Sequence, residues 1–345
     1  MTAESDSRHV STADVAVVGA GPAGLFAAYY AGLRGLRVAV LDSLPHPGGQ
    51  VSALYPEKQI YDIPALPGVL GRELIANLMD QVRPFTPEWL LGHTAVTLNR
   101  TAAGGGWVIG TDHGGDVRCG AVVITGGVGS FTPRRLPVAG PYENRGVVHH
   151  LERLEDHRDE DVVIVGGGDS AVDWALALEP LARSVTLVHR TDRFRAQAHG
   201  VELLHRSRVE VITGAQVTAC HGGPHLTAVD ITPLGGAGPL RRPARTLVTA
   251  LGFTARLGPL AQWGMALSGN RILVGTDMQT DVPGVFAAGD IATYPGRVPL
   301  IAVGFGEAAT AVNNAVAVVR PELGSDPGHS SDNPPQTAGA SRLAA

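Results

Sequence analysis

Two stretches of the chain follow the same pattern at a fixed spacing of 147 residues. Residues 15–43 and residues 162–190 each contain a β-branched apolar run, a glycine-rich turn, an Ala- and Leu-rich segment and a second apolar run. Buried parallel strands have this apolar character, and a helix usually connects them. The repeat therefore predicts an α/β fold with two Rossmann-like, three-layer (ββα) dinucleotide-binding domains.

The turn of each repeat carries glycine where a dinucleotide-binding turn needs it. The first repeat has Gly19, Gly21 and Gly24, and the second has Gly166 and Gly168 before a small third residue. The first glycine permits a tight turn, the second lets the backbone approach a pyrophosphate, and the third position lets helix and strand pack closely. The strand–turn–helix–strand context favours two dinucleotide sites over glycine turns in an ordinary α/β protein.

The residues that end each repeat distinguish the two ligands. Asp42 ends the first repeat, where a carboxylate accepts hydrogen bonds from ribose hydroxyls and repels a 2′-phosphate, so this site suits FAD or NAD. The second repeat ends in His189, followed by Arg190, Arg193 and Arg195. Guanidinium groups pair with phosphate through two hydrogen bonds, so these arginines predict NADP(H). A solvated basic loop is the alternative interpretation.

A third signal lies near the C-terminal end. An apolar run ends in Gly289-Asp290, and a helix-like segment follows at about 304–319. In flavoproteins with two dinucleotide sites this segment returns to the first domain. We therefore expect a discontinuous FAD-binding domain, residues 1–129 and 251–345, with an NADP-binding domain, residues 130–250, inserted.

Composition excludes several classes of protein. A net charge of −5 argues against a generally basic, nucleic-acid-binding surface. Cys119 and Cys220 are the only cysteines and form no dithiol or metal-ligand motif, so we expect no metal site. No apolar run approaches the roughly 18 residues of a membrane span, and the N-terminus lacks a signal sequence. We expect a cytoplasmic protein without a membrane partner.

These motifs resemble the low-molecular-weight thioredoxin-reductase superfamily, which belongs to the class II type of pyridine nucleotide-disulfide oxidoreductases. Within it they are most similar to the thioredoxin-reductase-like ferredoxin/flavodoxin–NADP reductases. The resemblance covers about residues 14–331, and its most specific pieces are ALYPEK at 53–58 and GDIATY at 289–294. It implies an FAD-dependent ferredoxin (or flavodoxin)–NADP⁺ oxidoreductase that acts as a homodimer.

The resemblance also implies roles for single residues. Gln50 would bind the flavin, Tyr55 would stack on one face of the isoalloxazine, and Asp290 would hold the ribityl chain. His329 resembles the residue that stacks on the other face from the partner subunit, with Ser331 near the ring edge. From the residues alone, Tyr55 equally suits a surface loop, and His329 equally suits a solvated tail.

Two departures from the family pattern matter. Its thioredoxin-reducing members carry a CxxC where this chain has VVHH at 147–150, so thiol–disulfide exchange is excluded. Thr191 stands where the family has a second arginine, which removes one phosphate contact and predicts a weaker preference for NADPH. Two alternatives stay open: an FAD- and NAD(P)H-dependent oxidoreductase of a small molecule, and a non-catalytic redox sensor.

Overall fold

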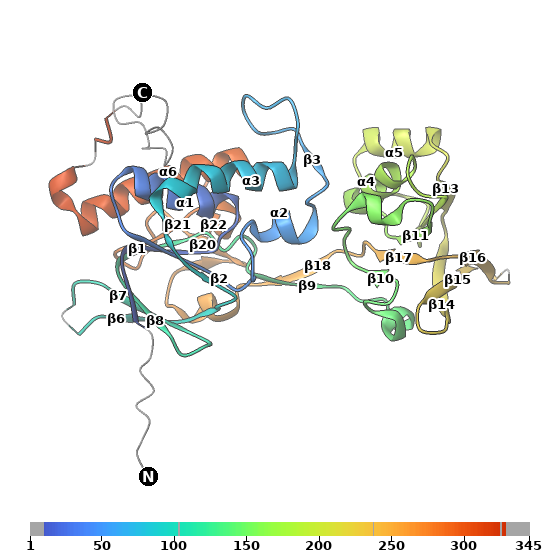
Figure 1. The fold of residues 1–345 in the computed structure, drawn as a ribbon, viewed down its shortest axis with the longest axis horizontal. Helices are drawn as coiled ribbons and strands as arrows, with labels where there is room; N and C mark the ends of the chain where they lie inside the picture. The colour runs from blue at the N-terminus through green and yellow to red at the C-terminus, as the bar shows by residue number, and fades with distance from the viewer. Residues whose placement is uncertain (1–9, 103, 237, 325, 329–345) are drawn as a thin grey trace, which may run out of the picture. The chain divides into compact units, whose positions relative to one another are not determined.

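The computed structural model describes residues 10–102, 104–236, 238–324 and 326–328. The chain divides into two compact units (Figure 1). Unit 1 comprises the residues up to 52, 59–130 and those from 255 on; unit 2 comprises 53–58 and 131–254. The sequence expectation placed the two crossings at 129/130 and 250/251 and kept residues 53–58 in the first domain.

The main sheet of unit 1 contains, in spatial order, β5 (Glu88–Leu91), β2 (Val38–Asp42), β1 (Val10–Val18), β8 (Asp116–Ile124), β7 (Trp107–Thr111) and β6 (Ala95–Arg100). A further strand, β21 (Val285–Ala287), pairs in parallel with β8. The strands β5, β2, β1 and β8 are also parallel, whereas β6 and β7 form an antiparallel hairpin beside β8. The parallel strands are apolar on both faces because helices and loops cover them.

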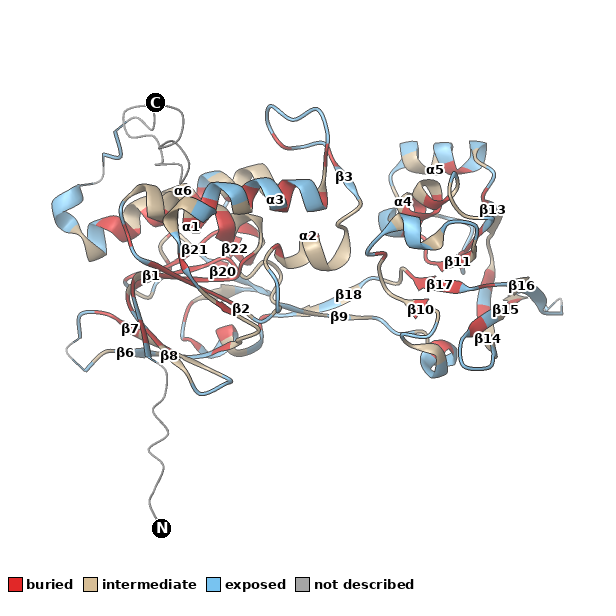
Figure 2. Cartoon of the chain, in the orientation of Figure 1, coloured by how far each residue is buried: buried red, intermediate tan, exposed pale blue. Residues whose placement is uncertain are grey.

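The helices α1 (Pro22–Leu33) and α6 (Ile301–Val319) pack against this sheet, and α3 (Gly71–Val82) packs against α1 (Figure 1). Buried positions recur at helical spacing in α6, as at Gly304, Glu307, Ala308 and Ala311. Figure 2 shows buried residues concentrated in the strands and along the helices of this unit. The helical layer therefore brings the start of α1 and the start of α6 to the same sheet.

By length and composition alone, α6 could cross a membrane. The expectation concerned uninterrupted apolar runs. Glu307 and Asn313-Asn314 interrupt this helix, so only its length and mean hydropathy reach the range of a membrane span. In the structure α6 packs against α1 and β8, and 39% of its most apolar window is buried. These contacts place α6 in the helical layer of unit 1.

Shorter elements complete unit 1 and the connections. They are α2 (Gly49–Leu54), the pair β3 (Gln59–Ile60) and β4 (Val69–Leu70), and the sheet of β19 (Leu267–Ser268), β20 (Arg271–Leu273) and β22 (Ala292–Thr293). The chain leaves and re-enters unit 1 through β9 (Ser130–Pro133) and β18 (Phe253–Arg256), which pair with each other.

Unit 2 contains a parallel sheet in the order β10 (Val147–Val148), β17 (Thr246–Thr249), β11 (Asp161–Val165), β12 (Ser184–Val188) and β13 (Glu210–Ile212). Its helices are α4 (Asp169–Leu178) and α5 (Ala198–Arg206). An antiparallel sheet follows, made of β14 (Ala215–Gly222), β15 (Leu226–Pro233) and β16 (Leu240–Pro243). The repeat is thus β1-α1-β2 in one unit and β11-α4-β12 in the other, which confirms the predicted fold class.

Candidate functional site

The fold itself requires two of the glycines in the first turn. Gly19 has φ +113°, and a Cβ there would lie 2.6 Å from the carbonyl carbon of Thr125. The Thr125 hydroxyl donates a hydrogen bond to the Gly19 carbonyl at 2.7 Å. A Cβ on Gly24 would overlap that same carbonyl oxygen. Gly19 and Gly24 therefore let α1 pack closely against β1 and the loop after β8.

Gly21 differs, because its side-chain position faces open space. Its nearest neighbour there would be the Cα of Gly49, at 4.0 Å. Gly21 is the N-cap of α1, whose first main-chain N–H groups have no partner within the helix. The N–H of Gly48 donates to the Ala20 carbonyl at 2.8 Å and holds the 48–49 loop beside this turn. This space fits the pyrophosphate of a dinucleotide, which needs close approach to the main chain.

Asp42 ends β2 next to this turn. Its carboxylate accepts hydrogen bonds from the N–H of Ala20 at 2.6 Å and from the N–H of Leu44 at 2.8 Å. Burial raises the pKa of Asp42, while these two hydrogen bonds oppose the shift. The main chain thus holds the predicted ribose-binding carboxylate against the glycine turn.

Gln50 lies in α2 and reaches the loop that follows β8. A Cβ on Gly127, which has φ +60°, would lie 2.5 Å from Nε2 of Gln50. The Gly19–Gly24 turn, Asp42 and Gln50 therefore gather at the same end of the unit 1 sheet. Tyr55 is half-buried directly after α2, in the segment that groups with unit 2. His329 and Ser331 lie outside the described residues.

A buried ion pair supports the Gly289-Asp290 turn. The Glu307 carboxylate, on α6, accepts hydrogen bonds from the N–H of Gly289 at 2.7 Å, the Tyr294 hydroxyl at 2.9 Å and Nε of Arg297 at 2.9 Å. Nη2 of Arg297 then donates to Asp290 at 3.2 Å. The Glu307 and Arg297 side chains are each only 3% exposed, whereas that of Asp290 is 45% exposed. The network fixes Asp290 at the surface of unit 1.

Sequence reasoning gave Arg297 and Glu307 no role. The available signal was an acidic residue in an otherwise Ala- and Val-rich helix, because a carboxylate is rarely buried without a partner. Nη1 of Arg297 is also buried and has no hydrogen-bond partner among the described residues. An unpaired buried donor costs about 1–3 kcal/mol, and more when charged. An anionic or carbonyl oxygen of a cofactor would satisfy it.

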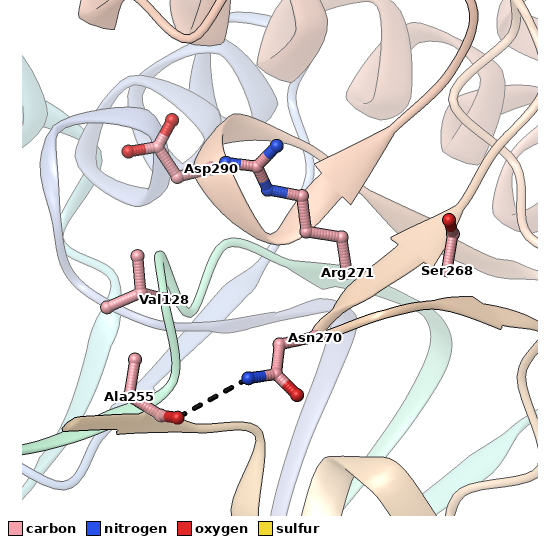
Figure 3. Close-up of a pocket in the computed structure, with 6 residues that line it drawn as sticks. All are labelled: Val128, Ala255, Ser268, Asn270, Arg271 and Asp290. Atoms are coloured by element: carbon pink, nitrogen blue, oxygen red, sulfur yellow. Dashed lines mark hydrogen bonds between the residues drawn. The ribbon is translucent and has the colours of Figure 1, made fainter.

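A cavity of about 300 Å³ opens beside Asp290 (Figure 3). It is lined by Val128, Ala255, Ser268, Asn270, Arg271 and Asp290. The guanidinium of Arg271 extends toward Asp290, and the Asn270 amide donates to the Ala255 carbonyl at 3.4 Å (Figure 3). The cavity belongs entirely to unit 1, and its charged lining suits a polar group.

The turn in unit 2 repeats the arrangement of the first. A Cβ on Gly166 would overlap the Ala250 carbonyl oxygen and would lie 2.9 Å from the Cβ of Ala171. Around the side-chain position of Gly168, the N-cap of α4, nothing in the described part of the chain lies within 4 Å. The first glycine is again needed by the fold, and the second again leaves room for a ligand.

His189 and Thr191 shape the loop after β12. His189 is 7% exposed, and its ring packs so closely over Gly167 that a Cβ there would overlap it. The Thr191 hydroxyl lies 3.0 Å from Nε2 of His189 and donates to the Arg193 carbonyl at 3.2 Å. Thr191 therefore takes part in the hydrogen bonding within the loop, a role that its departure from the family pattern did not indicate.

The three arginines of this loop are exposed. None of Arg190, Arg193 and Arg195 pairs with a carboxylate among the residues that the structure describes. The N–H of Arg195 donates to the Gly167 carbonyl at 2.7 Å, which ties the loop to the glycine turn. Uncompensated positive charge thus borders the open space at Gly168.

Burial disfavours the thiolate form of both cysteines. Burial raises the pKa of the Cys119 thiol to about 12 and that of Cys220 to about 11. Both are free, one in β8 and the other in β14. Because the thiolate is the reactive form, these residues offer no nucleophile at neutral pH.

Comparisons with known proteins agree over most of the chain. Residues 13–315 match the pyridine nucleotide-disulphide oxidoreductase family. The chain is 56% identical over 319 residues to a ferredoxin–NADP reductase of Salinispora tropica and 57% identical over 319 residues to one of Salinispora arenicola. Each match covers 92% of this chain and 98% of the relative. Among solved structures, it is similar to T. acidophilum thioredoxin reductase, with a TM-score of 0.73, 25% identity and coverage of 89% and 98% of the two chains.

Proposed function

Because this chain belongs to the pyridine nucleotide-disulphide oxidoreductase family, we propose that it transfers electrons between NADP(H) and ferredoxin or flavodoxin through FAD. The chain is an oxidoreductase, and its cofactors are FAD and NADP(H). One observation carries the assignment of the two sites. Each glycine turn leaves one open position, Gly21 beside the acidic Asp42 and Gly168 beside arginines that pair with no carboxylate in the described part of the chain.

The residues of unit 1 fit FAD. The N–H groups at the start of α1 would hold the pyrophosphate, Asp42 would accept from the adenosine ribose, and Gln50 and Asp290 would contact the flavin half. The unpaired Nη1 of Arg297 supports this assignment, because the network around Asp290 has one donor left for a ligand. Bound FAD supplies hydride acceptance and one-electron release, and the protein supplies orientation and electrostatics. Tyr55 would shield one face of the ring.

The residues of unit 2 fit NADP(H). The start of α4 at Gly168 would hold the pyrophosphate, with Gly166 making the turn. Arg190 and Arg195 would pair with the 2′-phosphate that distinguishes NADPH from NADH. Hydride transfer needs alignment of the two rings and no protein nucleophile. The high pKa of both thiols is consistent with that chemistry.

We further propose a cytoplasmic homodimer, in which His329 and Ser331 approach the flavin of the partner subunit. This proposal rests on the resemblance of the tail to that of the family. Sedimentation equilibrium of the full chain, whose mass is 35.8 kDa, tests it. A single species at twice that mass supports the dimer, and a species at the single mass at micromolar concentration rejects it.

An acidic carrier needs a basic docking surface on a protein that is acidic overall. Arg134 and Arg135 are exposed at the start of the inserted unit and are our candidates. We expect the double variant Arg134→Glu/Arg135→Glu to have a KM for ferredoxin about ten times higher, and this KM should depend less on salt concentration. NADPH-driven ferricyanide reduction, which needs no docking, should be unchanged. Charge reversal at Arg153, exposed elsewhere in unit 2, is the control. An unaltered salt dependence in the double variant removes these residues from the interface.

The cavity beside Asp290 favours one alternative, an oxidoreductase of a small polar molecule. In that case the polar lining contributed by Arg271 would bind the substrate. The two functions differ in a single observable, because only the carrier-linked enzyme is stimulated by ferredoxin.

A further inference from the structure

Three side chains of metal-ligand type meet at one edge of unit 1. His93 follows β5, while Asp112 and His113 lie in the turn between β7 and β8. One ligand atom from each of the three lies within 4.8 Å of the others. The expectation of no metal site rested on the cysteines, and the separation of His93 from Asp112 along the chain forms no recognisable motif.

The main chain holds this cluster in place without an ion. The N–H of Thr94 donates to Oδ1 of Asp112 at 2.9 Å, and the N–H of Asp112 donates to the Thr94 carbonyl at 3.1 Å. The N–H of His93 donates to the Asp42 carbonyl at 3.0 Å. The His93 and His113 rings lie 4.8 Å apart between centroids. Binding would therefore require little ordering of the backbone.

One nitrogen atom of the cluster lacks a hydrogen-bond partner among the residues described. Nδ1 of His93 is buried and has no hydrogen-bond partner in the described part of the chain. Leaving such an atom unpaired costs about 1–3 kcal/mol. By contrast, the side chains of His113 and Asp112 are 63% and 39% exposed, so an ion can enter from solvent and keep water in its remaining positions.

We propose that His93, Asp112 and His113 form a binding site for a divalent transition-metal ion such as Zn²⁺. Two imidazoles and one carboxylate suit zinc, nickel or copper, whereas Mg²⁺ and Ca²⁺ select oxygen ligands. Zinc lies about 2.0–2.1 Å from each ligand atom, so two of its ligands are at most about 4.2 Å apart. The three ligand atoms lie within 4.8 Å of one another, so binding would need side-chain rotation to bring them within the limit set by zinc.

The site would connect the end of β5 to the β7–β8 turn, one hydrogen bond away from Asp42. An ion bound there would stabilise the edge of unit 1 at which the adenosine part of FAD is proposed to bind. Any binding to the folded state alone raises the unfolding temperature with metal concentration. The metal proposal itself does not depend on the proposed function, since it needs only the folded unit 1.

The test uses the flavin-loaded full chain without a polyhistidine tag, stripped with chelator and equilibrated by dialysis against Zn²⁺ at neutral pH. We expect one zinc per chain at micromolar concentration and at least a tenfold weaker affinity in His113→Asn, since loss of even an outer partner of a ligand costs about 10–100-fold. His225→Asn, at an exposed turn in unit 2, is the matched control and should bind as the parent does. Circular dichroism and FAD content verify that each variant is folded.

Two results would overturn the site. The first is equal zinc affinity in the parent and in His113→Asn, which identifies binding elsewhere on the chain. The second is no zinc bound by the parent at up to millimolar concentration. Activity with ferredoxin is not read in this experiment, so failure of the metal site and failure of the proposed function remain distinguishable.

Discussion

Gly21→Ala is expected to leave the protein folded but to weaken its affinity for FAD by about a hundredfold or more. The added methyl has room in the fold, because its nearest neighbour is the Gly49 Cα at 4.0 Å. It lies, however, where the pyrophosphate must come within about 2.9 Å of main-chain N–H groups. A hundredfold loss is about 2.8 kcal/mol, the size of one or two lost hydrogen bonds to a charged group.

Two further glycine variants make this result specific. Gly24→Ala places its methyl on the Gly19 carbonyl oxygen, so we expect little soluble protein. Gly168→Ala, at the open position of the other turn, should keep FAD and lose affinity for NADPH. FAD content after desalting, fluorescence titration of the flavin-free protein and circular dichroism measure these effects. Normal FAD affinity in Gly21→Ala would show that the pyrophosphate does not bind at this turn.

Replacement of Arg190 and Arg195 together by alanine is expected to lower kcat/KM for NADPH about a hundredfold and to leave that for NADH unchanged. Both guanidinium groups are exposed and have no carboxylate partner in the described structure, so they are available to a 2′-phosphate. Each hydrogen bond to a charged group contributes about 1.5–3 kcal/mol, and tenfold corresponds to about 1.4 kcal/mol. The main-chain bond from Arg195 to Gly167 survives the substitution.

The readout is the rate of flavin reduction by each nucleotide under anaerobic conditions. Arg206→Ala, which removes an exposed ion pair with Glu202 on α5, is the control and should change neither rate. An equal fall with NADPH and NADH would mean that the arginines support the loop and do not recognise the phosphate.

The sequence predicted the features that local chemistry determines. Both β-turn-α-β units follow from short-range periodicity and glycine spacing, and the end of β12 at Val188 and that of α6 at Val319 match the expected segments. A criterion based on uninterrupted apolar runs does not detect the mean hydropathy of α6, because Gly, Glu, Thr and Asn interrupt its apolar residues. Helical spacing brings those apolar residues onto one buried face.

The features that were missed depend on contacts between distant segments. Glu307 lies 18 residues along the chain from Gly289, whose N–H donates a hydrogen bond to its carboxylate. Only the packing of α6 against unit 1 brings the two together. The His93 and Asp112 pair likewise requires β6, which begins just after His93, to pair with β7 in antiparallel register, with Ala95 opposite Thr111. From the sequence, Thr191 predicted only the loss of one phosphate contact. The structure shows that its hydroxyl also hydrogen-bonds to His189 and to the Arg193 carbonyl. Whether that loop still prefers NADPH is decided by its arginines.

The central claim is that this chain connects NADPH to a one-electron carrier. Its most direct test follows NADPH-driven cytochrome c reduction by the purified flavin-loaded protein, with and without added ferredoxin, and repeats the series with flavodoxin and with NADH. The account predicts strong stimulation by a carrier and a higher rate with NADPH than with NADH. Rapid flavin reduction by NADPH, together with cytochrome c reduction that neither ferredoxin nor flavodoxin stimulates, would contradict it and would assign the chain to small-molecule chemistry.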